Sequence, residues 1–180
     1  MIHMTPEEKQ IWNTCISFHG HVCAGLLIGF KASMYAIRLL NLDLYSEEEL
    51  ACIAETDTCS VDAVQVVLGC SVGKGNLFFH LTGKQAFSFY NRKTGDSVRL
   101  VYRPAPVKNR MEHLEYLNGK PPEDLFDVKP VKLSLPIHHR SFSKAICSVC
   151  GEETSQQMLC LKDGQLLCRD CAESLDRFHI

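Results

Sequence analysis

The chain has 180 residues, of which 46% are hydrophobic and 22% are charged, and its formal net charge is -2. This composition is typical of a soluble globular protein and excludes a largely disordered chain, which could not bury enough apolar surface. The small net charge gives no global basic field of the kind that attracts nucleic acid. The longest apolar run, residues 24–30, is far too short for a membrane helix, which needs about 20 residues. Because no signal-peptide pattern opens the chain, we expect a cytoplasmic protein.

The first forty residues have the pattern of two helices. The sequence Thr-Pro-Glu-Glu at residues 5–8 forms a capping box with proline at the first helical position, so we expect a helix to begin there. A second helix is predicted over residues 23–40, and small residues fall four apart along it. These residues are Gly25, Gly29 and Ser33. Such a face allows another backbone to approach the helix closely.

The middle of the chain mixes helical and extended patterns. Ser46 and Glu49 form a capping signature that predicts a short helix, and residues 51–55 either finish that helix or begin a strand. Residues 61–68 are predicted to be a helix that ends at Gly69, which suits a left-handed C-terminal cap.

Residues rich in β-formers then predict an antiparallel meander. Its three strands are expected at residues 77–81, 85–90 and 97–102. A helix is predicted over residues 109–118, and the proline-punctuated stretch that follows is expected to be partly extended and to end in a linker. The expected fold is α+β, with N-terminal helices packed on an antiparallel sheet.

Ten cysteines are unusual for a chain without a secretory signal, and they favour metal binding or reactive thiolates over disulfides. Four of them form two C-x2-C pairs, namely Cys147, Cys150, Cys168 and Cys171. Two such pairs can supply a closed tetrahedral shell of sulfur, which predicts a structural zinc rather than a catalytic one. Two disulfides are the alternative. Cys160 is surplus to this set.

The pattern around these pairs is that of a treble-clef finger. The Asp-Gly pair at residues 163–164 predicts a hairpin, and the chain after Cys168 has helical spacing. So short a segment needs a metal or disulfides to hold its fold. We therefore expect a core domain over residues 1–135, a linker over 136–144 and a four-cysteine zinc finger over 145–180.

A second candidate site lies in the core domain. His19, His21 and Cys23 fall at the predicted start of the second helix, where unpaired N–H groups and the helix dipole favour a thiolate. Cys59 precedes another predicted helix, so the same effect is expected there. A Cys/His site with fewer than four protein ligands keeps a position open for substrate or water. We expect a metal or redox site here, which binds either a second transition metal, with zinc, nickel and iron as candidates, or a redox-active ligand.

The remaining features are less specific. Cys15 and Cys52 lie among apolar neighbours and are predicted to be buried. Cys70 lies in a glycine-rich segment, and its sequence context fits a site residue and a packing residue equally well. The segment 69–75 lacks the spacing of a phosphate-binding P-loop, although Lys74 brings a positive charge near the cysteines. The linker region carries a basic run that fits either a solvated linker or a contact with an acidic partner. This run comprises Lys129, Lys132, His138, His139, Arg140 and Lys144.

Four motifs together resemble a known family. They are HGHVCAG at residues 19–25, DTCSVDAVQ at 57–65, GCSVGKGNL at 69–77 and GKQAF at 83–87. In order and approximate spacing they are similar to the E subunit of formylmethanofuran dehydrogenase and its bacterial relatives, over about residues 10–104. Some members append a treble-clef zinc finger. Ala24 departs from the family, which usually has proline there.

The resemblance implies an α+β core that forms a homodimer. It also implies a cavity lined by Cys23 and Cys59 first, and then by His19 and His21. It suggests an accessory to a molybdenum- or tungsten-dependent oxidoreductase, whose subunits would be the partners, with no membrane contact. No complete catalytic machinery is evident in the chain.

Two other functions stay open. One is a metal- or redox-sensing module in which the finger and the basic linker contact DNA or a protein, with nucleic acid the less favoured partner. The other is an independent enzyme that uses Cys23 as a nucleophile and His21 as its base.

Overall fold

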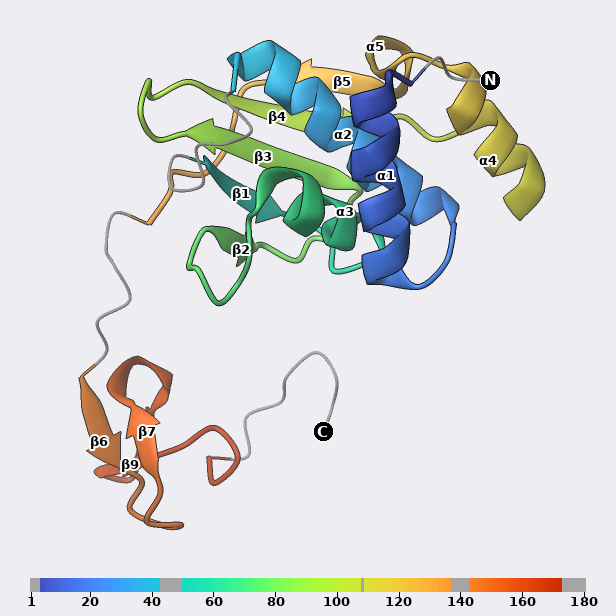
Figure 1. Cartoon of the computed structure of the whole chain (residues 1–180). Helices are drawn as coiled ribbons and strands as arrows, with labels where there is room; N and C mark the ends of the chain where they lie inside the picture. The colour runs from blue at the N-terminus through green and yellow to red at the C-terminus, as the bar shows by residue number, and fades with distance from the viewer. Residues whose placement is uncertain (1–3, 43–49, 108, 137–142, 173–180) are drawn as a thin grey trace. The chain divides into compact units, whose positions relative to one another are not determined.

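The computed structural model describes residues 4–42, 50–107, 109–136 and 143–172. The chain divides into two compact units, residues 1–136 and 137–180, and each is described by itself (Figure 1). Within the described ranges, no helix combines the length and apolar character needed to cross a bilayer.

Two helices open the first unit, as the sequence predicts. α1 spans Pro6–His19 and begins with the full capping box, in which Thr5 and Glu8 each bond the other's backbone N–H. It ends at Gly20, whose φ of 89° is left-handed and therefore suits glycine. α2 spans Ala24–Leu40, and Cys23 is its N-cap residue.

The first unit contains a five-stranded sheet in the order β2-β1-β3-β4-β5. The strands are β1 Leu50–Ala54, β2 Leu77–Phe79, β3 Ala86–Asn91, β4 Ser97–Tyr102 and β5 Phe126–Lys129. β1 pairs in parallel with β2, and the other three pairings are antiparallel. Largely antiparallel pairing with helices packed on the sheet agrees with the predicted α+β class.

The predicted meander is wrong at its first strand. Residues 50–54, whose pattern fits either a helix or a strand, form β1 and lie between β2 and β3. The connection from β1 to β2 runs through a helix, α3 Ser60–Leu68, and such a crossover makes two neighbouring strands parallel. The capping signature at residues 46–49 lies outside the described residues.

Three helices, α1, α2 and α3, lie over the sheet in Figure 1, and α2 runs across it. The side chains between the layers are fully buried and largely aromatic or aliphatic. They include Leu26, Leu27, Phe87, Phe89, Leu100 and Phe126. α4 Arg110–Gly119 and the short α5 Pro122–Leu125 then lead the chain into β5.

The small-residue face of α2 is where α3 makes its closest approach. A Cβ built on Gly29 would lie 2.0 Å from the backbone oxygen of Ser60, and one on Gly25 would lie 3.0 Å from the Cβ of Cys59. Ser33 is fully buried on the same face. The predicted close approach is therefore confirmed, and its partner is the first turn of α3.

The described residues of the second unit form two small hairpins. β6 Lys144–Ile146 pairs with β7 Glu153–Ser155, and a 3-10 turn, η1 Gln156–Met158, leads to the next hairpin. β8 Cys160–Lys162 pairs with β9 Gln165–Leu167 across the Asp-Gly turn at residues 163–164, where both φ angles are positive. The helix predicted after Cys168 falls mainly on residues outside the described ranges.

We expect Gly29→Ala to destabilise the core unit by about 1–3 kcal/mol, the usual cost of overpacking. The new methyl group would meet a backbone oxygen, which cannot move aside as a flexible side chain can. Urea denaturation measures the loss.

Gly119→Ala is the matched control, because Gly119 is also helical and a Cβ there would meet no atom within 4 Å. It should leave the stability unchanged or raise it slightly, since alanine favours a helix. Equal stabilities for the two variants would contradict the close packing of α2 on α3.

Candidate metal centres

Three predicted ligands meet at the junction between α1 and α2. One ligand atom from each of His19, His21 and Cys23 lies within 4.8 Å of the other two. His19 is the last residue of α1 and Cys23 is the N-cap of α2, so the left-handed Gly20 turns the chain between them. A five-residue segment therefore gathers two imidazoles and a thiol.

The thiol of Cys23 is held by the start of α2. Its Sγ accepts the backbone N–H of Leu26 at 3.3 Å and lies 3.6 Å from Nε2 of His19. The imidazole rings of His19 and His21 lie 4.5 Å apart between centroids. A helix N-terminus favours negative charge, so this position suits sulfur as a thiolate or as a metal ligand.

Asp62 on α3 orients His19. Its Oδ2 lies 2.7 Å from Nδ1 of His19, and the His19 side chain is 10% exposed. This contact directs the other ring nitrogen, Nε2, toward Cys23. A carboxylate behind a histidine fixes the tautomer and raises its basicity, as at many metal sites. The role of Asp62 was not predicted from the sequence, although this residue lies in the first turn of a helix that begins beside Cys59.

Cys59 lies beside this group rather than within it. It is the N-cap residue of α3, and its side chain makes no capping hydrogen bond. Burial raises the pKa of Cys59, and contact with the thiol of Cys23 raises it further. Burial and the neighbouring Cys23 thiol thus oppose the thiolate that the start of α3 was expected to favour at Cys59.

The other core cysteines are buried. Cys15 and Cys52 are fully buried, as predicted. Cys70 is buried as well, and its Sγ approaches the backbone oxygen of Leu50 at 3.9 Å. Burial raises the pKa of Cys70 to about 12, despite the opposing charge of Lys74. Cys70 is thus an inert packing residue in this structure, and among the described residues it joins no group of metal-ligating atoms.

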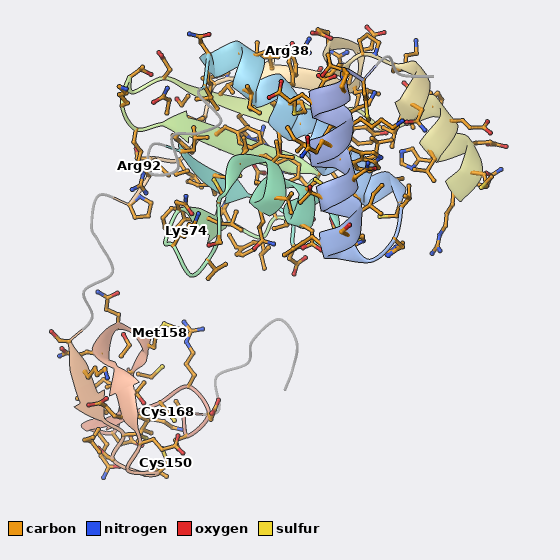
Figure 2. The ribbon with its side chains drawn as sticks, in the orientation of Figure 1. Arg38, Lys74, Arg92, Cys150, Met158 and Cys168 are labelled. Carbon is orange, nitrogen blue, oxygen red and sulfur yellow. The ribbon has the colours of Figure 1, made fainter. Side chains whose placement is uncertain are left out.

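The four cysteines of the finger converge. The sulfurs of Cys147, Cys150, Cys168 and Cys171 all lie within 4.8 Å of one another. Figure 2 labels Cys150 and Cys168, whose sulfurs are 3.9 Å apart. Backbone N–H groups also face the sulfurs, because Cys168 donates to Cys147 at 3.3 Å and Cys171 donates to Cys168 at 3.5 Å. Such N–H groups support thiolates.

The four thiols of the finger need a cation if they are all to ionise. Backbone N–H groups, that of Cys168 first, lower the pKa of Cys147 to about 6. The neighbouring sulfurs, that of Cys168 first, raise the pKa of Cys171 to about 12. One thiolate forms readily, but four cannot form together without a positive ion. A tetrahedral Zn²⁺ ion bound by four thiolates satisfies this donor set and leaves no open position for water.

Comparison with known families identifies the family of the first unit. The family described as "FmdE, Molybdenum formylmethanofuran dehydrogenase operon" matches residues 18–128, which is more than half of the chain. This chain belongs to the FmdE family. Its second unit matches the prokaryotic dksA/traR C4-type zinc finger over residues 140–177. The resemblance inferred from the sequence motifs is confirmed.

Two individual proteins extend the comparison of this FmdE-family chain. A protein from Syntrophus aciditrophicus, described as like the E subunit (FmdE) of tungsten formylmethanofuran dehydrogenase, has a crystal structure that aligns with a TM-score of 0.68 and 26% identity, over 94% of each chain. A probable S-adenosyl-L-methionine-binding protein from Archaeoglobus fulgidus is 28% identical over 87% of this chain. The present chain spans about half (51%) of that relative's length.

We expect Cys168→Ser to remove one zinc per chain, because it opens the four-sulfur shell and removes the sulfur that Cys171 faces. Elemental mass spectrometry on the purified protein measures the zinc content.

Cys160→Ser is the matched control. Cys160 lies in β8 and belongs to no group of metal-ligating atoms among the described residues, so its zinc content should equal that of the unmodified protein. Equal zinc loss in both variants would contradict the assignment of the four ligands.

Proposed function

We propose that this FmdE-family protein binds one transition-metal ion at the cluster of His19, His21 and Cys23, in addition to the zinc of its finger. The observation that carries the proposal is the convergence of three ligand atoms within 4.8 Å at the junction of α1 and α2. The hydrogen bond between Asp62 and His19 supports it, because it directs a ring nitrogen toward the cluster.

The donor set limits the ion and its chemistry. Imidazole and thiolate ligands suit zinc, nickel and iron better than magnesium or calcium, which prefer oxygen. Three protein ligands leave at least one coordination position open, as in catalytic rather than structural zinc sites. Cys59 lies beside Cys23 and supplies a second thiol next to the cluster.

The protein as a whole would act as an accessory to a molybdenum- or tungsten-dependent oxidoreductase. The family description names a molybdenum formylmethanofuran dehydrogenase operon, and the Syntrophus protein is named for a tungsten enzyme. The described residues hold these two compact groups of metal-ligating atoms and no further one. A homodimer is part of this proposal, and analytical ultracentrifugation tests it.

A second function is favoured by the surface of the finger. Large apolar side chains are more than half exposed there, including Ile146 at 57%, Val149 at 63% and Leu161 at 74%. Exposed apolar residues on so small a unit fit a protein contact better than a nucleic-acid contact. The finger would then bind a protein partner while the core cluster senses metal or redox state.

We expect the intact protein, purified anaerobically without added metal, to hold close to two metal ions per chain, and Cys23→Ser to hold one. Loss of the Cys23 sulfur removes one of three ligands and the acceptor for the Leu26 N–H.

Asp62→Asn should weaken metal binding at the core cluster about 10- to 100-fold, the usual cost of removing a partner of a metal-bound histidine.

The finger zinc serves as the internal standard of this experiment, because neither substitution touches it. Circular dichroism verifies that both variants are folded. One metal ion in the unmodified protein, or two in folded Cys23→Ser, would overturn the proposal.

The partner of the finger has its own test. Strong salt-dependent binding to DNA would favour a nucleic-acid partner in place of the protein partner of the finger.

A further inference from the structure

A cavity of about 320 Å³ lies in the core unit, and it shares no lining residue with the metal-ligand cluster. Its walls come from the start of α1, the later part of α2 and the junction of α4 with α5. His19 and Glu8, near the two ends of α1, are separated by about 16 Å along the helix axis. The cavity and the cluster therefore occupy opposite ends of α1.

One wall of the cavity is apolar. Met4, Phe30, Met34 and Pro121 line it, together with the neighbouring Pro122. Phe30, Met34 and Arg38 follow one another at four-residue spacing, so one face of α2 supplies much of the lining. A volume of about 300 Å³ is at the lower end for small-molecule sites, which leaves room for a compact organic molecule.

A buried lysine faces the same cavity. Lys31 is only 4% exposed, and its Nζ donates to the backbone oxygens of Leu117 and Lys120. An ammonium group has three N–H donors, and among the described residues these two carbonyls are its acceptors, so one donor is left for a ligand. Burial lowers the pKa of Lys31 to about 8, an effect that the nearby Glu123 partly offsets. An anion in the cavity would offset the free-energy cost of burying the charged Lys31 side chain.

Among the cations that line the cavity, Lys31 is the one that favours an anion. Lys120 also lines it but is paired with Asp124 at 3.7 Å, and Glu8 is the one carboxylate among the described lining residues. Glu8 already accepts the backbone N–H of Thr5 in the capping box at 2.9 Å. Arg38 bonds Glu123 at 2.8 Å with both side chains about half exposed, so it stands at the rim, and Figure 2 labels it on α2.

We propose that this cavity binds a small carboxylate with an apolar body, with Lys31 as the anchor for the carboxylate and the Phe30 and Met34 side chains as the contact for the body. A single buried ammonium with one remaining donor fits one carboxylate oxygen. The site is separate from the proposed metal function, so either can fail without the other.

The test uses the full zinc-loaded chain and two probes, 3-phenylpropanoate and its neutral counterpart 3-phenylpropan-1-ol. Backbone amide NMR titrations follow each probe. We expect the carboxylate to bind at least about tenfold more tightly than the alcohol, which corresponds to one charge-assisted contact. The shifts should fall on residues of α2 and the junction of α4 and α5.

Two substitutions locate the site. Lys31→Met keeps the apolar stem and should abolish the preference for the carboxylate. Because this change also removes the donor to Leu117 and Lys120, Met34→Trp provides a second variant that keeps Lys31 and fills the cavity. Met34→Trp should abolish binding of both probes. Met111→Trp is the matched control, since Met111 on α4 is 71% exposed and outside the cavity lining.

Equal affinity for the two probes, or no saturable binding of either at millimolar concentration, would overturn the proposal. Unchanged binding by folded Met34→Trp would do so as well. Failure of Cys23→Ser to lose a metal ion would leave this site unaffected, because the metal experiment and the carboxylate titration have separate readouts.

Discussion

The close contact between α2 and α3 is the constraint on which the core site depends. Two glycines of α2 leave no side chain between the helices, so the first turn of α3 comes within atomic contact of Gly25 and Gly29. This approach places Cys59 beside Cys23 and allows Asp62 to reach His19 at 2.7 Å. A larger residue at either glycine would move α3, and with it Asp62 and Cys59, away from the junction of α1 and α2 that holds the ligands.

The finger and the core cluster offer different sets of ligands. In the finger, two hairpins bring together four thiols that cannot all ionise without a cation, and the shell is closed. In the core, a turn between two helices supplies two imidazoles and one thiol. The finger therefore has the donor set of a structural ion, whereas the proposed core site, with three ligands, would hold an exchangeable or reactive ion.

Local features of the fold could be predicted from the sequence, and distant ones could not. The capping box at residues 5–8, the glycine cap at Gly69 and the two C-x2-C pairs depend on neighbours a few positions away, and each was found. The place of β1 in the sheet depends on pairings with β2 and β3, which no local pattern encodes. The role of Asp62 was missed because it bonds a residue 43 positions earlier. The raised pKa of Cys59 was missed because it follows from burial and from contact with the thiol of Cys23, which lies at the start of another helix.

The shortness of the ligand segment in the core has a thermodynamic consequence. All three ligands fall within residues 19–23, so an unfolded chain can wrap the same ion at little cost in loop closure. An ion that binds both the native and the unfolded chain adds little to the free energy of unfolding. The finger must instead close a much longer loop between its two cysteine pairs. Its ion therefore binds the folded form and adds to the free energy of unfolding. Of the two centres, the core cluster is the one at which a bound ion could be exchanged without loss of the fold.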